Sequence, residues 1–313
     1  MFDSINWLYV GILAGGAVLC TALYALYLKK YGKKTAIAWA ALPMGAVLGV
    51  ALSKLVYLIM TQATYLSVHG FPVSSPAPWS VFGGLFGVYL GVWLAGRLLG
   101  EKGNMYLELF APFGMLLIAV MRAAEFSLDQ VGLGELVQNE ALQFFPVCWS
   151  VSMWGRSVWY MAVFVWEAVW ALLLFFLCLV RQGKRGPSRA NGLSMTLFYF
   201  YLGQMLFESL RVECIRLGFL RLEQLLSAVV CFALVCVLCK QYKNAGNVFV
   251  RWLPALLTLC GIGAMVGWMF ALDEPSYTRW VVYALIILTL AGMGAVYVWA
   301  EKRVLNKAEG GRA

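Results

Sequence analysis

Several ionisable side chains lie within or at the ends of long apolar runs, where hydrocarbon would surround them. They are Lys54, Glu108, Arg122, Glu125, Glu167, Glu208, Arg211 and Glu213. Each costs about 3 kcal/mol at the centre of a bilayer and less near its surface, so each needs a partner, water or a purpose. Arginines suit the binding of a phosphate, and carboxylates suit the transfer of a proton. The group could therefore bind an anionic substrate and act on it.

The spacing of these residues places some of them together. Three pairs are separated by three positions, which puts both members on one helix face. Ion pairing that only neutralises buried charge is the structural alternative. The pairs of Arg122 with Glu125 and of Glu208 with Arg211, together with Glu213, fall at the same side of the expected membrane, at the depth of a lipid phosphate. The pairs are Lys54 and Tyr57, Arg122 and Glu125, and Glu208 and Arg211.

The elements that carry these residues are predicted to be membrane helices. Of the 313 residues, 62% are hydrophobic and 12% are charged, and the mean hydropathy is +0.79. A soluble domain has about 25% charged residues. The apolar runs have the length of a membrane helix and lack the alternation of barrel strands. We expect an all-α, polytopic bundle of nine helices, near 5–28, 35–60, 80–99, 105–123, 157–180, 192–210, 222–239, 252–271 and 280–300.

Basic residues predict the orientation of this bundle. With the amino terminus outside, 17 Lys and Arg residues fall on the inside and six on the outside, so we expect N-out and C-in. The net charge of +9 then reflects topology and attraction to anionic lipid, and does not indicate nucleic acid. All six outside residues are arginines and none is a lysine, which favours specific contacts of these residues with a phosphate or a carboxylate over a role in solubility alone. They are Arg122, Arg156, Arg211, Arg216, Arg221 and Arg279.

The longest connection, residues 122–156, mixes acidic and aromatic residues and is predicted to form a small head on the outer surface. Six of the eight cysteines lie in apolar runs, and only Cys148 and Cys214 lie outside, where a disulfide is possible. His69 is the only histidine, so no histidine cluster for a metal is expected.

The third apolar run begins with the sequence SVFGGLFG at residues 80–87. Gly83, Gly87 and Gly91 recur every four residues, a pattern that brings two helix backbones close. Two glycines at a helix start, Gly83 and Gly84, could instead offer N–H groups to an anion. Packing is the favoured interpretation from spacing alone.

Six short segments, taken together and in order, resemble one family. They resemble motifs of the prolipoprotein diacylglyceryl transferases, enzymes of the bacterial inner membrane, over residues 1–243. The family would place a seven-helix core there, and 244–313 would add two helices and a basic tail. The segments are SKLVY at 53–57, SVFGGLFG at 80–87, FAPFGMLLIAVMRAAEF at 110–126, FVWE at 164–167, QMLFESLR at 204–211 and EQLLS at 223–227.

The resemblance implies a site and a reaction. It implies that a cysteine thiolate of a lipoprotein precursor displaces glycerol phosphate from phosphatidylglycerol, with no cofactor and no metal. Another acceptor that bears a thiol, hydroxyl or amine group is the alternative to the lipoprotein precursor. The catalytic residues would then be Arg122, Glu125, Glu208 and Arg211. The lipid and its phosphate would contact Lys54, Tyr57, Gly83, Gly84, Glu167, Gln204 and Gln224.

The chain departs from the family pattern at four positions. Phe82 stands where the family has His, and Gln204 where it has Arg. Glu125 replaces Asn, and Lys54 replaces Arg. A base for the thiol would then come from Glu125, Glu208 or Glu213. The alternative is a member of the family that binds or passes a lipid or peptide without transfer chemistry.

Overall fold

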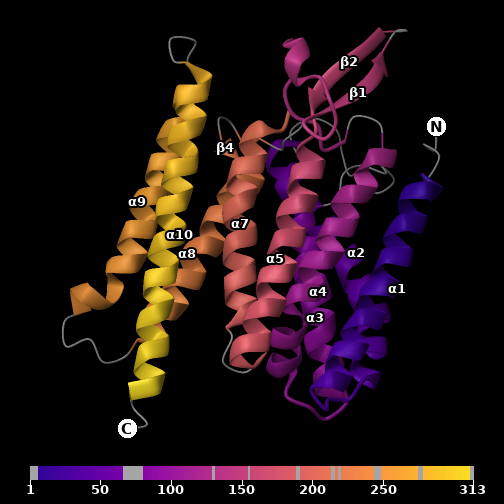
Figure 1. Ribbon diagram of the computed structural model, residues 1–313, viewed down its shortest axis with the longest axis vertical. Coiled ribbons are helices and arrows are strands. Elements are labelled where there is room, and N and C mark those ends of the chain that lie inside the picture. Colours follow the sequence, from indigo (N-terminus) through magenta and orange to yellow (C-terminus); the bar gives the residue numbers. More distant parts are fainter. Residues whose placement is uncertain are drawn as a thin grey trace. The chain divides into compact units, whose positions relative to one another are not determined.

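The computed structural model describes residues 6–65, 80–128, 131–153, 156–187, 191–212, 216–217, 220–242, 248–273 and 278–310 (Figure 1). Within them every predicted apolar run corresponds to a helix, so the all-α membrane bundle is confirmed. The helices are α1 (Trp7–Lys30), α2 (Ala36–Tyr65), α3 (Val81–Leu98), α4 (Gly103–Ala124), α5 (Val163–Arg185), α7 (Gly192–Leu210), α8 (Leu222–Gln241), α9 (Val248–Asp273) and α10 (Arg279–Gly310).

Eight of these helices are long and apolar enough to cross a membrane, and α7 is the exception among the described helices. It carries Gln204 and Glu208. The N-out and C-in orientation stays a prediction.

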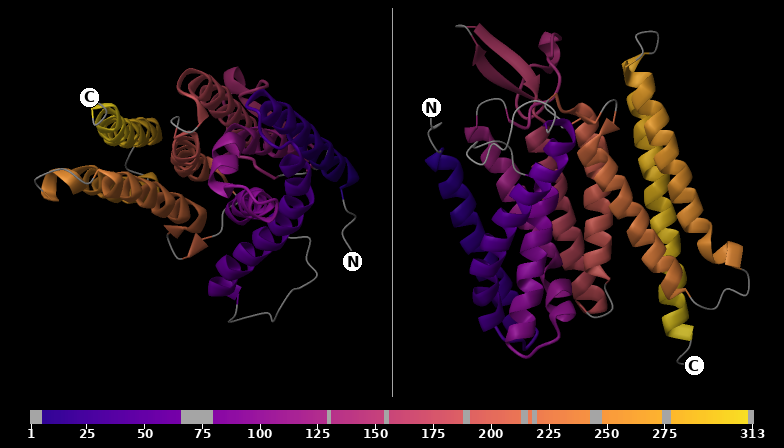
Figure 2. Two further views of the ribbon diagram at one scale, coloured as in Figure 1. Left: turned by 90° about the horizontal axis from the view of Figure 1, so that it is seen from below. Right: turned by 180° about the vertical axis from the view of Figure 1, so that it is seen from behind.

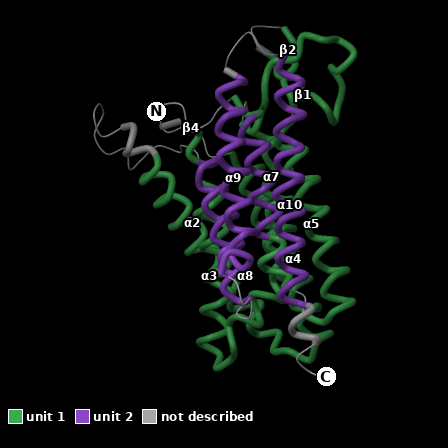
Figure 3. Tube along the Cα trace, turned by 90° about the vertical axis from the view of Figure 1, so that its left-hand side faces the viewer, with its two compact units in different colours: residues 1–196, 210–222 green, residues 197–209, 223–313 purple. Residues whose placement is uncertain are grey.

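The helices belong to two compact units (Figure 3). The first comprises residues 1–196 and 210–222, and the second comprises 197–209 and 223–313. The division at residue 243 that the family resemblance implies stays a prediction, because it rests on sequence correspondence and not on packing.

Glycines join α2 to α3 within the first unit. A Cβ atom on Gly83 would collide with the backbone of Leu52, and one on Gly87 with the backbone of Leu48. At Gly91 it would lie 2.6 Å from the Cα atom of Gly45. The two backbones are therefore in contact along this seam, as the four-residue spacing predicted.

Substitution at Gly87 tests the seam. We expect Gly87→Ala to destabilise the protein by about 2 kcal/mol, because the new methyl group meets backbone that cannot rotate away. Gly84→Ala is the matched control on the same helix, since its nearest neighbour would be Ser53 at 3.8 Å, an ordinary contact. Thermal unfolding in detergent measures both variants. Equal melting temperatures for the two would contradict a close seam.

A polar network joins α1, α4, α5 and α7 near the start of α7 in the first unit. Gln182 donates to the carbonyl of Glu108 (2.5 Å) and accepts from the Tyr27 hydroxyl (2.8 Å). The Glu108 carboxylate accepts from the N–H of Leu193 (3.0 Å) and so caps the start of α7. Glu108 lies 14 positions before Arg122 on α4, about 21 Å along the helix. A structural role thus explains the half-buried position of Glu108 in an apolar run.

The segment predicted as a head is folded, and it is longer than predicted. It contains two short 3₁₀ helices, η1 (Glu125–Ser127) and η2 (Glu140–Leu142), and an antiparallel hairpin. The hairpin strands, β1 (Cys148–Met153) and β2 (Arg156–Met161), extend beyond the neighbouring ends of α4 and α5 in the first unit (Figure 2). A fifth helix starting at 157 is therefore wrong: residues 157–161 pair with β1, and the helix starts at Val163.

The hairpin is tied to the first unit by a small core and by backbone bonds. Leu133, Ala162 and Phe164 form the core, against which Trp149 packs. Cys148 is buried and forms no disulfide with another described cysteine, and its burial raises the pKa of the thiol. Cys214 lies outside the described residues, so the pairing of these two cysteines stays a prediction, and His69 also lies outside them.

The second unit is held by aromatic and carbonyl contacts. Phe198 stacks on Tyr297 with ring centroids 4.2 Å apart, and the Tyr199 hydroxyl donates to the carbonyl of Gly294 (3.3 Å). Two short strands, β3 (Arg216–Leu217) and β4 (Leu220–Arg221), precede α8 and belong to the first unit.

A cavity of about 670 Å³ lies in the second unit between α9 and α10, beside Trp268, and none of the predicted site residues lines it.

Candidate functional site

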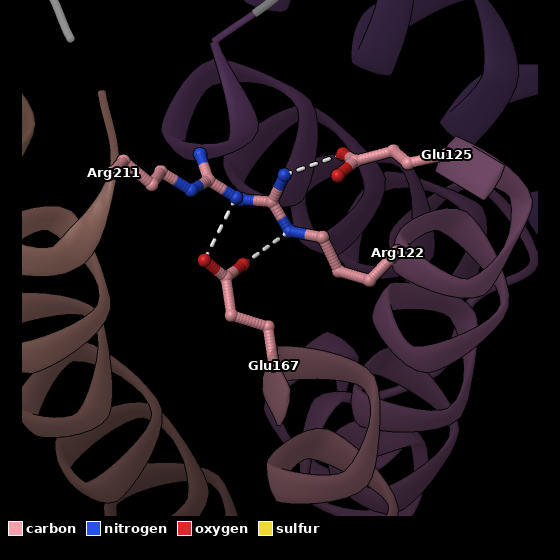
Figure 4. Close-up of polar contacts among 4 residues, drawn as sticks. All are labelled: Arg122, Glu125, Glu167 and Arg211. Atoms are coloured by element: carbon pink, nitrogen blue, oxygen red, sulfur yellow. Dashed lines mark hydrogen bonds and ion pairs between the residues drawn. The ribbon is translucent and has the colours of Figure 1, made fainter. Parts of the chain in front are cut away.

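Four charged residues from separate parts of the chain meet in the first unit (Figure 4). Arg122 lies in the last turn of α4, and Glu125 follows it in η1. Glu167 begins the second turn of α5, and Arg211 directly follows α7. We call these four residues the ion cluster.

Local backbone structure holds each member in place. The 3₁₀ turn after α4 keeps Glu125 on the same side as Arg122. Arg211 is fixed by an isolated β-bridge to Gly134 of the head, and its carbonyl accepts from the guanidinium of Arg221 (2.9 Å). The head therefore positions one of the two arginines.

Glu167 is the centre of the ion cluster. Its two carboxylate oxygens lie on different arginines: Oε2 is 2.5 Å from Arg122 Nε, and Oε1 is 2.7 Å from Arg211 Nη2. Arg122 Nη1 also donates to Glu125 Oε1 at 2.5 Å. Figure 4 shows Arg122 lying between the two carboxylates. The Glu167 carboxylate thus holds both guanidinium groups close together and offsets the repulsion between their positive charges.

The ion cluster is buried and formally neutral. Side-chain exposure is 3% for Arg122, 6% for Glu125, 0% for Glu167 and 10% for Arg211. Two guanidinium groups balance two carboxylates, so neutralisation of buried charge is part of its role. Two of its atoms, Arg122 Nη2 and Glu125 Oε2, are buried without a hydrogen-bond partner among the described residues. Buried polar atoms are rarely left this way, and these two mark a position where a ligand could bind.

The seam between α2 and α3 brings the predicted site residue Gly83 of α3 close to the backbone that precedes Lys54 on α2. Gly83 packs on Leu52 and Ser53, directly before the half-buried Lys54; Tyr57 is one turn further and also half-buried. The N–H of Gly84 donates to the carbonyl of Ser80 (3.0 Å), so that amide is used within the helix. Phe82, at the position where the family has His, is buried.

Three predicted residues belong to the second unit. Gln204 and Glu208 are buried and lie one turn apart on α7. Gln224 of α8 is also buried and donates to the carbonyl of Met205 (3.1 Å). Their participation in a common site with the ion cluster stays a prediction. Glu213 lies outside the described residues.

Sequence reasoning missed Gly132. Its backbone has a positive φ of 71°, and a Cβ atom there would collide with Glu125 Oε2. The head therefore closes directly over Glu125. The only sequence signal was a pair of glycines in VGLGE, and glycine pairs also occur in ordinary turns.

Among the described residues, no group of three or more His, Cys, Asp and Glu side chains is placed to hold a metal.

Comparison with known proteins decides the family. The family model for prolipoprotein diacylglyceryl transferase matches residues 3–240. The chain belongs to the prolipoprotein diacylglyceryl transferase family. The match includes all four members of the ion cluster and leaves α9 and α10 outside.

Individual members of the prolipoprotein diacylglyceryl transferase family are distant relatives. A phosphatidylglycerol–prolipoprotein diacylglyceryl transferase of Clostridium novyi (strain NT) is 24% identical over 166 residues, which are 53% of this chain and 64% of that relative. One of Limosilactobacillus reuteri (strain DSM 20016) is 22% identical over 249 residues, covering 77% of this chain and 89% of the relative. One of Streptococcus agalactiae (strain A909) is 25% identical over 181 residues, covering 56% and 68%. No solved structure matches the chain.

Proposed function

We propose that this protein transfers the diacylglyceryl group of phosphatidylglycerol to the cysteine thiol of a lipoprotein precursor. Membership in the prolipoprotein diacylglyceryl transferase family carries this proposal, and the relatives named as phosphatidylglycerol–prolipoprotein diacylglyceryl transferases support a phospholipid-dependent diacylglyceryl transferase function. The apolar helices make it a multi-pass membrane protein, and the family implies the bacterial inner membrane.

In the proposed reaction the thiolate sulfur attacks the lipid carbon that is bonded to the phosphate oxygen. A C–S bond forms, the C–O bond breaks, and its electron pair stays on the oxygen of the departing glycerol phosphate. Negative charge therefore grows on the phosphate. Arg122 and Arg211 are held together by Glu167 and are suited to stabilise that charge by paired N–H donors.

The thiol proton needs an acceptor. Glu125 and Glu208 are the buried carboxylates available near the end of α4 and on α7, in place of the family His. Lys54, Tyr57 and the start of α3 would contribute to the lipid headgroup site, together with Gln204 and Gln224. These roles are proposals that rest on the correspondence of positions within the family.

A lipid-binding member without transfer chemistry is the second candidate. Two observations favour it: buried Phe82 stands where the family has His, and the ion cluster is already neutral without a substrate. Such a protein would bind an anionic lipid or a peptide and release it unchanged.

A transfer assay separates the two candidates. The purified chain, in nanodiscs that contain labelled phosphatidylglycerol, is supplied with a cysteine-containing lipoprotein signal peptide. The proposed function predicts a peptide whose mass increases by one diacylglyceryl group. The Limosilactobacillus reuteri relative serves as the positive control. Absence of the product, with the relative active and lipid binding intact, would leave only the second candidate.

A further inference from the structure

The contacts of Arg122 limit how a phosphate can reach it. A guanidinium binds phosphate best through two neighbouring N–H groups in a fork. On Arg122, Nε faces Glu167 and Nη1 donates to Glu125, while Nη2 has no hydrogen-bond partner among the described residues. Each two-nitrogen edge of the guanidinium thus includes one nitrogen that a carboxylate already occupies. A phosphate can bind in a fork only where one of these carboxylates leaves.

The two carboxylates differ in how firmly they are held. Glu167 lies within the long helix α5 and contacts both arginines of the ion cluster. Glu125 lies in a three-residue 3₁₀ turn and pairs with Arg122 alone, and its Oε2 atom has no hydrogen-bond partner among the described residues. Release of Glu125 breaks one ion pair, whereas release of Glu167 separates both arginines from their shared counter-ion. Release of Glu125 therefore costs less than release of Glu167.

Charge balance leads to the same residue. The ion cluster has a formal charge of zero, and a phosphodiester that joined it unchanged would give the four residues and the phosphate together a buried net charge of −1. Replacement of one carboxylate by the phosphate keeps the charge around the arginines at zero. We infer that Glu125 occupies the anion position on Arg122 when no lipid is bound, and that the phosphate of phosphatidylglycerol takes this position on binding. The inference rests on the proposed lipid substrate and assigns Glu125 a role in selecting it.

Removal of the internal anion should therefore strengthen lipid binding. The purified full chain is placed in phosphatidylcholine vesicles, and brominated phosphatidylglycerol is titrated while quenching of tryptophan fluorescence is followed. We expect Glu125→Gln to bind phosphatidylglycerol about tenfold more tightly than the wild type, because the competing charge is gone. Glu140→Gln removes one carboxylate from the exposed η2 turn of the same head, and its affinity should equal that of the wild type.

The outcomes are distinct. Unchanged or weaker binding by Glu125→Gln overturns the inference, as does a lower transfer rate at saturating lipid with unchanged lipid affinity, which would make Glu125 a base only. Where Glu125→Gln does not fold, Glu125→Asp keeps the charge on a side chain one methylene shorter. It should bind about threefold more tightly, and no gain overturns the inference. Failure of the transfer assay with tighter binding by Glu125→Gln would refute the transferase proposal alone.

Discussion

Replacement of Glu167 by alanine is expected to destabilise the protein by about 4 kcal/mol, the largest stability effect of any single substitution in the ion cluster. Glu167 is the shared counter-ion of Arg122 and Arg211 and is fully buried. Without it, two guanidinium groups remain buried with one carboxylate, and Arg211 loses its ion pair with Glu167. The melting temperature in detergent, relative to the wild type, measures the effect.

A double variant shows whether charge is the reason. Glu167→Met together with Arg211→Met removes one anion and one cation and leaves the pair of Arg122 and Glu125 in place. We expect it to recover a substantial part of the stability that Glu167→Met alone loses, because apolar residues of similar size can replace a buried ion pair. Equal stability of the single and double variants would show that the loss comes from packing. Glu140→Ala, at an exposed position, controls for the removal of a carboxylate.

The sequence could predict the bundle because the membrane leaves the chain few choices. A run of about 20 apolar residues must satisfy its own backbone hydrogen bonds, and a helix does so within the run. The same reasoning fails at the start of α5, where apolar residues continue from 158 into the helix without a break. There, residues 157–161 bond to β1, a partner that hydrophobic composition does not specify.

The ion cluster shows the same boundary between local and distant contacts. The pair of Arg122 and Glu125 follows from a spacing of three on one helix, and the structure contains it. The central role of Glu167 does not follow from any spacing, because Arg122 reaches it from the end of α4 and Arg211 from the residue after α7. The family resemblance implied a lipid contact for Glu167, whereas in the structure Glu167 forms ion pairs with both arginines. Gly132 was missed for the same reason, since its contact with Glu125 depends on how the head folds back.

Substitution of Arg211 by lysine should have the largest effect on transfer. Lysine keeps the positive charge but replaces the planar fork with a single ammonium group, which cannot bind phosphate and Glu167 together in the same geometry. Stability should change little, because the ion pair with Glu167 can persist. The rate of diacylglyceryl transfer should fall by about 100-fold, a typical loss for one donor to a developing negative charge.

Arg156→Lys is the control variant for Arg211→Lys. Arg156 is an exposed arginine of β2, in the head whose Gly134 pairs with Arg211, and its replacement should leave the transfer rate unchanged. If Arg211→Lys retained the wild-type rate, charge alone would suffice at this position, and Arg211 would serve only to neutralise Glu167. A fall in rate with unchanged melting temperature would instead separate the chemistry of the ion cluster from its part in folding, since Glu167→Ala is expected to lose stability and Arg211→Lys is not.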